Sequence, residues 1–199
     1  YTADDSTRFI PGDTDEAGYR RLLERLFGAA AAEQVAGRFP VQTGTSAAVQ
    51  ARRVFTAACF VVGALRYADA FRETGGKVYL YRYSRVEPAD AAQGLGARHG
   101  VELRYVFDSF GAYNKKPTAA QRALCDAMHG AWVRFIKQGD PNGAGAGADD
   151  TAAPSGYPLP IWHLYEKDSR LAMDFGETAA AQTPAETEDA DFLGAFPLG

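Results

Sequence analysis

Residues 77–84 read KVYLYRYS, and this stretch decides the fold class of the 199-residue chain. Half of its residues are β-branched or aromatic, with almost no alternation of polar side chains. That pattern is typical of a strand covered on both faces, as in parallel sheets with helices on either side. The sequence therefore predicts an α/β fold.

A helical pattern opens the chain. Asp13 and Glu16 stand at the spacing of a capping box, so we expect a helix to begin there. An apolar stripe at helical spacing follows and is stopped by Gly28. The members of the stripe are Tyr19, Leu22, Leu23, Leu26 and Phe27.

Three more helices are expected. A short one over residues 31–36 ends before a Phe-Pro pair, where proline disfavours helical geometry in the preceding residue. The next begins at its N-cap Ser46 and runs to about Thr74, before two glycines. The last begins at Thr118, with a capping-box glutamine three residues on, and ends at Gly139.

The remaining segments are shorter. Residues 86–98 carry proline and glycine without periodicity, so we expect a loop that ends at His99. Residues 102–107 are apolar, and their pattern fits either a strand or a helix. Residues 143–156 have the low-complexity composition of a flexible surface loop. Ile161–Tyr165 and Arg170–Phe175 are expected to form the strands of a hairpin.

Composition limits the classes of function. Apolar residues make up 46% and charged residues 23%, as in an ordinary globular protein, and the formal net charge is -4. The chain has no excess of positive charge that would attract nucleic acid or anionic lipid. No apolar run is long enough to suggest a membrane span. We therefore expect neither nucleic acid nor a membrane as a partner. Cys59 and Cys125 alone make neither a disulfide framework nor a zinc site, and the compartment stays open.

His99 is the strongest candidate for chemistry. It ends a long loop after a buried strand, and such loops are where α/β proteins place reactive groups. The alternative is a loop histidine with only a structural hydrogen bond. His129 lies within a predicted helix and His163 within a predicted strand, and we interpret both as structural.

A nucleophile for this histidine is missing. No Gly-x-Ser-x-Gly pentapeptide occurs, and Ser46 in the nearest match is better explained as a helix N-cap. Cys59 and Cys125 fall in helical stripes, where buried thiols are inert. Metal-ligand spacings are absent, and we expect the pairs Asp4-Asp5 and 149–150 to lie in flexible surroundings.

Several motifs resemble type-B carboxylesterases, the group that includes para-nitrobenzyl esterases and cholinesterases. Residues 96–103 read GARHGVEL, with YVF at 105–107, and resemble the histidine segment of that family. Residues 132–142 read WVRFIKQGDPN and are similar to its Trp-x-x-Phe-x-x-x-Gly-Asp-Pro-Asn helix end. The stretches 78–83 and 159–173 resemble the strand before the histidine loop and the closing hairpin.

The resemblance implies the C-terminal part of an α/β-hydrolase fold, with a mostly parallel sheet flanked by helices and a closing hairpin. Residues 1–175 would belong to the catalytic domain, and residues 176–199 would form a weakly specified acidic tail. His99 would be the base of a Ser-acid-His triad, and Glu102 would steady the site. Asp15-Glu16 is similar to the family's acid motif but opens a helix, so the triad acid is expected before Tyr1, together with the serine.

The implied activity is hydrolysis of carboxylic esters, without a cofactor. The implied partners are the N-terminal part of the same enzyme and a small ester substrate, and the isolated chain is expected to be inactive. Without that part, apolar faces are expected to be exposed. The alternative is a catalytically silent, esterase-like module that binds proteins. An upstream Gly-x-Ser-x-Gly motif would distinguish the two.

Overall fold

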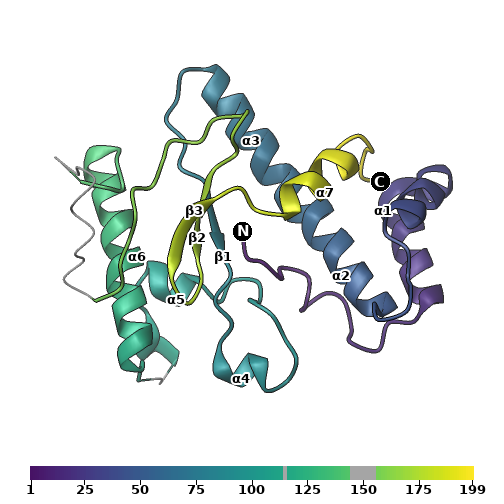
Figure 1. Cartoon of the computed structure of the whole chain (residues 1–199), viewed down its shortest axis with the longest axis horizontal. Helices are drawn as coiled ribbons and strands as arrows, with labels where there is room; N and C mark the ends of the chain where they lie inside the picture. Colours follow the sequence, from purple (N-terminus) through teal and green to yellow (C-terminus); the bar gives the residue numbers. More distant parts are fainter. Residues whose placement is uncertain (114–115, 144–155) are drawn as a thin grey trace. The chain divides into compact units, whose positions relative to one another are not determined.

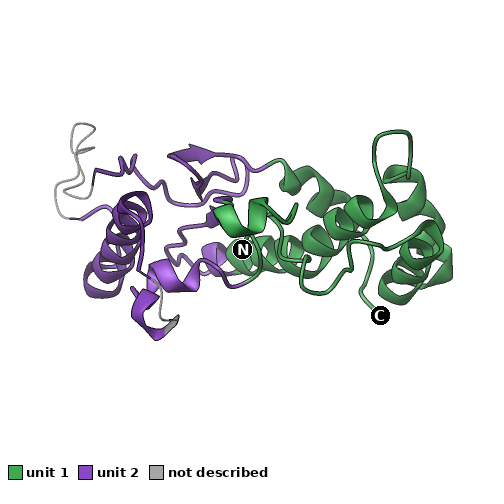
Figure 2. Cartoon of the chain, turned by 90° about the horizontal axis from the view of Figure 1, so that it is seen from below, with its two compact units in different colours: residues 1–70, 86–99, 185–199 green, residues 71–85, 100–184 purple. Residues whose placement is uncertain are grey.

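The computed structural model describes residues 1–113, 116–143 and 156–199. Most of the low-complexity segment 143–156 lies outside these residues. The chain forms two compact units, each assembled from segments that are far apart in the sequence (Figure 2). Unit 1 contains residues 1–70, 86–99 and 185–199, and unit 2 contains residues 71–85 and 100–184. The predicted division of the chain into a catalytic part (residues 1–175) and a C-terminal tail (residues 176–199) stays a prediction.

Helix α1 (Glu16–Arg38) opens unit 1 (Figure 1). Its N-cap is Asp15, whose carboxylate accepts from the backbone N–H of Gly18 at 2.7 Å. The predicted cap at Asp13 is wrong, because the backbone of Thr14 turns back to Pro11 before the helix starts. Gly28 has a φ of 77° and interrupts the helical geometry, as the sequence predicted.

A long helix with one irregular turn follows. It consists of α2 (Ala47–Thr56), a π-helical turn (Ala57–Val61) and α3 (Val62–Glu73). The hydroxyl of Ser46 accepts from the backbone of Val49 at 3.3 Å, which confirms the predicted N-cap. The end at Glu73 agrees with the predicted end near Thr74. The π-turn was not predicted, because helical periodicity does not reveal one extra residue in a turn.

This helix is also apolar. Over Ala47–Glu73 the best 18-residue window has a mean hydropathy of 1.4, and 44% of that window is buried. By length and composition such a helix could cross a membrane, but core helices of soluble proteins have the same properties. The expectation that no membrane is involved stays a prediction.

The C-terminal residues of unit 1 have regular structure, although the sequence left them weakly specified. Helix α7 (Glu186–Leu193) packs on the π-turn. Asp189 is almost fully buried and accepts two hydrogen bonds from the guanidinium of Arg53, at 2.6 and 2.8 Å. This bond pair raises the pKa of Arg53. It fixes α7 against α2.

Unit 2 contains a three-stranded sheet in the order β1 (Tyr81–Tyr83), β2 (Ala172–Phe175) and β3 (Ala179–Gln182). Strands β1 and β2 are parallel, and β2 and β3 are antiparallel. The predicted strand at 161–165 is wrong, and the hairpin is formed by β2 and β3 instead. The backbone of Trp162 bonds to the side chain of Asn142 rather than to a strand.

Besides the end of α3, the described part of unit 2 contains three helical segments. The residues left open at 102–107 form α5 (Leu103–Val106), which packs against α6 (Ala119–Gln138). A short 3-10 helix (Phe110–Tyr113) follows α5. The predicted capping box of α6 is confirmed by reciprocal bonds between Thr118 and Gln121.

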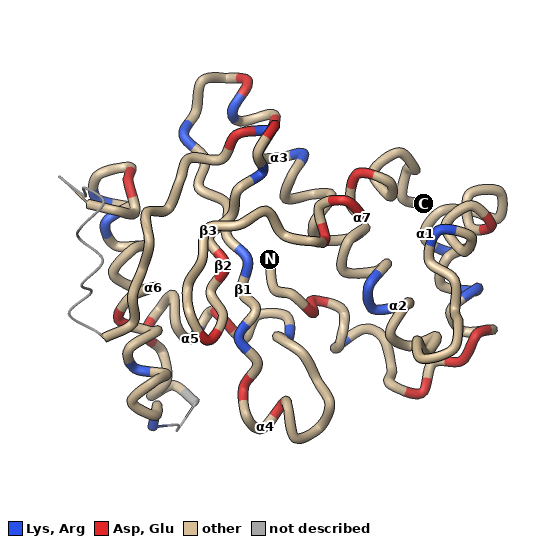
Figure 3. The backbone as a smooth tube through the Cα atoms, viewed as in Figure 1, with Lys and Arg blue, Asp and Glu red and all other residues tan. Residues whose placement is uncertain are grey.

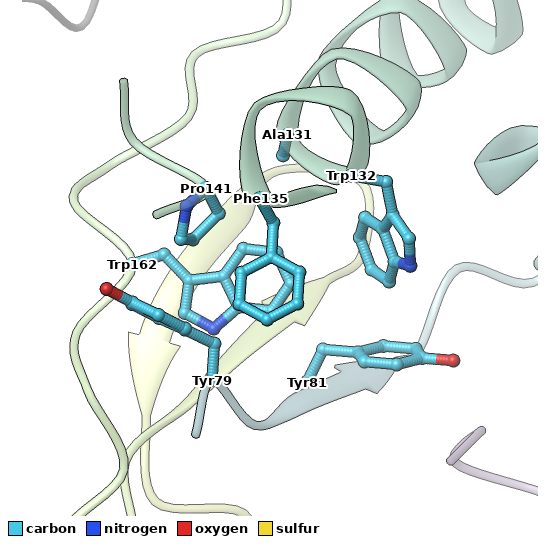
Figure 4. A pocket seen from close by; sticks show the side chains of 7 residues that line it. All are labelled: Tyr79, Tyr81, Ala131, Trp132, Phe135, Pro141 and Trp162. Carbon is cyan, nitrogen blue, oxygen red and sulfur yellow. The ribbon is translucent and has the colours of Figure 1, made fainter. Parts of the chain in front are cut away.

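Helix α6 lies to one side of the sheet (Figure 1). Aromatic side chains from α6, β1 and the neighbouring segments form a cluster between them (Figure 4). The cluster borders a cavity of about 150 Å³. Its lining residues are Tyr79, Tyr81, Ala131, Trp132, Phe135, Pro141 and Trp162. The indole N–H of Trp162 donates to the carbonyl of Leu80 at 2.9 Å, which ties this ring to the segment before β1. Burial and the neighbouring carboxylate of Asp140 raise the pKa of Tyr79.

We expect Asp189→Ala to destabilise the protein by about 1–3 kcal/mol, because it removes two charge-assisted hydrogen bonds from a buried position. Glu188→Ala is the matched control, since Glu188 is exposed on the same helix and should change stability by less than about 0.5 kcal/mol. Urea unfolding of both variants measures the difference. Equal effects would contradict the role given to the Arg53–Asp189 pair.

Candidate active site

The N-terminal segment of unit 1 pairs with the loop that carries His99. The backbone N–H of Asp4 donates to the carbonyl of Ala97 at 3.1 Å, and Asp4 forms a parallel bridge with Arg98. The backbone N–H of Gly96 donates to the Asp4 carboxylate at 3.3 Å. These bonds bring residues 4 and 5 beside the end of the loop.

Gly96 permits this close approach. A Cβ atom at this position would lie 2.7 Å from the Cβ of Asp4, which is closer than real Cβ contacts. Any larger residue would push the two segments apart.

The loop before His99 is itself anchored. It contains a short helix, α4 (Pro88–Ala91), where the sequence predicted only irregular structure. Proline at the first helical position starts this turn without losing a backbone bond. The guanidinium of Arg98 contacts the buried carboxylate of Asp90 at 2.8 Å, and the backbone of Leu95 bonds to Asp90 at 2.9 Å. These contacts hold the residue before His99 in place.

Asp5 is buried and held by its neighbours. Its carboxylate accepts from the backbone N–H of Thr2 at 2.9 Å and from the Thr2 hydroxyl at 2.7 Å. The next residue, Ser6, donates its backbone N–H to the hydroxyl of Thr56 at 3.2 Å. The long helix of unit 1 therefore supports the segment that carries Asp5.

The imidazole of His99 lies against this carboxylate. Its Nδ1 is 3.0 Å from Oδ1 of Asp5, and the side chains of His99 and Asp5 are 46% and 2% exposed. An ionised carboxylate only accepts hydrogen bonds, so we assign the Nδ1 proton to His99. In the neutral ring Nε2 then has a free lone pair. This arrangement can accept a proton at Nε2 while the carboxylate stabilises the resulting imidazolium.

The other candidates from the sequence, Glu102, His129 and His163, belong to unit 2. Glu102 is buried in unit 2, where its backbone carbonyl accepts from Tyr105 and Val106 at the start of α5. His129 bonds through Nδ1 to the carbonyl of Val106 at 2.9 Å, as expected for a structural histidine. His163 is exposed in a segment without regular structure.

The two cysteines are free thiols in poorly reactive surroundings. Burial, followed by a hydrogen bond to Asp108, raises the pKa of Cys125 to about 12. Burial also raises the pKa of Cys59. Among the described residues, no three His, Cys, Asp or Glu side chains gather as metal ligands would.

Basic residues (Lys, Arg) and acidic residues (Asp, Glu) are both spread along the described chain (Figure 3).

Comparison with known proteins identifies the family. A model described as "Carboxylesterase family" matches residues 18–193, which is most of the chain. The chain belongs to the carboxylesterase family. This confirms the resemblance found in its motifs.

Curated relatives match this carboxylesterase-family chain over shorter stretches. Carboxylesterase 4A of Bos taurus is 29% identical over 116 residues, which are 57% of this chain and 18% of the relative. Acetylcholinesterase-1 of Trittame loki is 33% identical over 76 residues, which are 37% of this chain and 13% of the relative. The matched part is therefore less than a fifth of each of these relatives.

Solved structures establish the fold. A carboxylesterase of Geobacillus stearothermophilus superposes with a TM-score of 0.70 at 24% identity, over 96% of this chain and 38% of that one. EstA of Aspergillus niger gives a TM-score of 0.73 at 16% identity, over 98% of this chain and 38% of that one. The carboxylesterase-family chain has part of an α/β-hydrolase fold, which confirms the fold class expected from the sequence.

Sequence reasoning missed Asp5. The Asp4-Asp5 pair was placed in flexible surroundings, but Asp5 is buried and bonded to a histidine 94 residues away. Asp5 also precedes residues 18–193, the part of the chain that the family model matches. The 94-residue spacing between Asp5 and His99 has no meaning without the fold.

We predict that His99 is in the Nδ1–H tautomer when neutral, because Asp5 accepts that proton. Two-dimensional ¹⁵N–¹H spectra of the labelled side chain distinguish the tautomers. Asp5→Ala should shift the population toward Nε2–H, whereas Asp13→Ala, which removes an exposed carboxylate from the same segment, should not. Nε2–H as the main form of the unchanged protein would contradict the assignment.

Cys125 should resist alkylation by iodoacetamide at pH 8. A pKa raised to about 12 means that the thiolate, which is the reactive form, is scarce far below that pH. The rate in the native protein should be at least about a hundredfold slower than in the urea-unfolded chain, as measured by mass spectrometry of the peptides. Comparable rates in the two states would contradict the burial of this thiol.

Proposed function

We propose that this chain carries the general base, His99, and its acid partner, Asp5, of a serine hydrolase that cleaves carboxylic esters. The nucleophilic serine would come from polypeptide outside residues 1–199. The observation that carries the proposal is the 3.0 Å contact between Nδ1 of an accessible His99 and the buried carboxylate of Asp5. Membership of the carboxylesterase family supports the same reaction class.

The chemistry follows from the two nitrogens of the imidazole. Nε2 takes the proton of the serine hydroxyl as its oxygen attacks the ester carbonyl, and the tetrahedral intermediate forms. The same proton then passes from Nε2 to the departing alcohol, which leaves an acyl-enzyme. Water repeats the sequence and releases the acid. Asp5 stays ionised throughout and stabilises the imidazolium of His99 in both halves.

This proposal differs from the sequence-based expectation in one respect, since it places the triad acid within the chain rather than before Tyr1. The donors for the oxyanion would lie with the serine in the absent polypeptide. No step needs a cofactor. The role of Glu102 in steadying the site, which the family resemblance implies, stays a proposal.

The full-length protein with His99→Ala should lose about 10⁴-fold in kcat on a simple ester, and Asp5→Asn a similar amount, because neither variant can complete the proton transfer. His163→Ala is the matched control and should keep normal turnover, since His163 is exposed and irregularly placed. Turnover of a chromogenic acetate ester measures all three variants. Retention of most activity by His99→Ala would contradict the assignment.

Fluorophosphonate labelling separates this function from a silent, protein-binding module. If the proposal holds, the reagent labels a serine upstream of this chain, and intact mass locates the adduct. A full-length protein without a labelled serine and without an upstream Gly-x-Ser-x-Gly motif would favour the binding module instead.

A further inference from the structure

Both oxygens of the Asp5 carboxylate accept hydrogen bonds within unit 1. Oδ1 lies 3.0 Å from Nδ1 of His99 and also accepts from the hydroxyl of Thr2 at 2.7 Å. Oδ2 accepts from the backbone N–H of Thr2 at 2.9 Å. The side chain of Asp5 is 2% exposed and Thr2 is fully buried, so water has little access to these bonds.

The two bonds from Thr2 fix the plane of the carboxylate. The last side-chain torsion of an aspartate has a broad energy profile, so its carboxylate turns easily unless outside groups hold it. Thr2 donates to one oxygen from its hydroxyl and to the other from its backbone, and a partial rotation of the carboxylate would lengthen both bonds. This arrangement keeps Oδ1 directed at the imidazole of His99.

The hydroxyl bond matters most when the imidazole is protonated. In the proposed mechanism His99 becomes an imidazolium in both halves of the reaction, and Asp5 stabilises this cation only while Oδ1 stays in place. Electrostatic interactions are stronger in surroundings with little water, so a misplaced carboxylate costs more there than at a surface. Loss of the Thr2 hydroxyl would therefore cost more in the transition state, where the ion pair forms, than in the ground state with a neutral ring.

We propose that Thr2 is a positioning residue for ester hydrolysis, which acts through Asp5 by holding its carboxylate against His99. This inference rests on the proposed function and adds a residue on which its rate depends. Threonine suits this role, because its β-branched side chain has little freedom at χ1 and keeps the hydroxyl in one direction. The alternative is a local role, in which the bonds between Thr2 and Asp5 serve only the turn at residues 2–5.

The first test removes the hydroxyl in the full-length protein with Thr2→Val, which keeps the branched shape and the backbone bond to Oδ2. It should lower kcat on a chromogenic acetate ester by about tenfold and leave KM within about twofold, because the lost bond supports the imidazolium rather than the substrate. Thr2→Ser keeps a hydroxyl and should retain kcat within about threefold. Thr14→Val is the matched control and should keep normal turnover, since the Thr14 hydroxyl bonds to the carbonyl of Pro11 instead.

A second comparison separates positioning from a structural role. In the Asp5→Ala background, Thr2→Val should lower kcat no further, because the hydroxyl has lost the group through which it acts. A bond that serves only the turn would instead lower the melting temperature of Thr2→Val and leave its kcat unchanged. Thr2→Ala removes the same hydroxyl with a smaller side chain and repeats the comparison if valine does not fit. Thermal melting reports on the folding of each variant.

A fall in kcat for Thr2→Val that Thr2→Ser avoids, and that is absent in the Asp5→Ala background, supports the inference. Unchanged kcat in a folded Thr2→Val or Thr2→Ala variant overturns this inference alone. Failure of both variants to fold also overturns it, since the hydroxyl would then serve the structure. Full activity of Asp5→Ala and of His99→Ala overturns the proposed function, and the inference falls with it.

Discussion

The hydrogen bond between Asp5 and His99 is the contact on which the candidate site depends. It joins residues 94 positions apart, and it needs the N-terminal segment to pair with the loop end at 96–98. Gly96 allows the two segments to approach, and Thr56 on the long helix supports the residue after Asp5. A buried carboxylate with several donors fixes the imidazole far more firmly than a loop alone could.

The long helix that begins at Ala47 supports the candidate site at two points. Its Thr56 supports the acid segment, and the π-turn that begins at Ala57 brings Phe60 against the imidazole. Helix α7 packs on that turn and is held by the Arg53–Asp189 pair. Helix α7, through Asp189, therefore stabilises the turn of unit 1 that carries Phe60.

Local sequence signals predicted the parts that local interactions determine. Ser46 and the Thr118–Gln121 pair were recognised as helix starts because a cap needs only neighbouring residues. His99 was singled out by its loop and its motif. The strand expected at 161–165 was wrong, and the π-turn and the partner of His99 were missed. The conformation of residues 161–165 and the partner of His99 depend on contacts between distant segments, whereas helical periodicity does not reveal one extra residue in a turn. Trp162, for example, pairs with the Asn142 side chain rather than with a strand.

The central claim is that Asp5 and His99 act as one unit in proton transfer. A double-mutant cycle on kcat of the full-length protein tests it most directly. The account predicts that Asp5→Ala combined with His99→Ala is no slower than His99→Ala alone, because the carboxylate acts only through the imidazole. Losses that multiply in the double variant would show that the two residues act independently and would contradict the account.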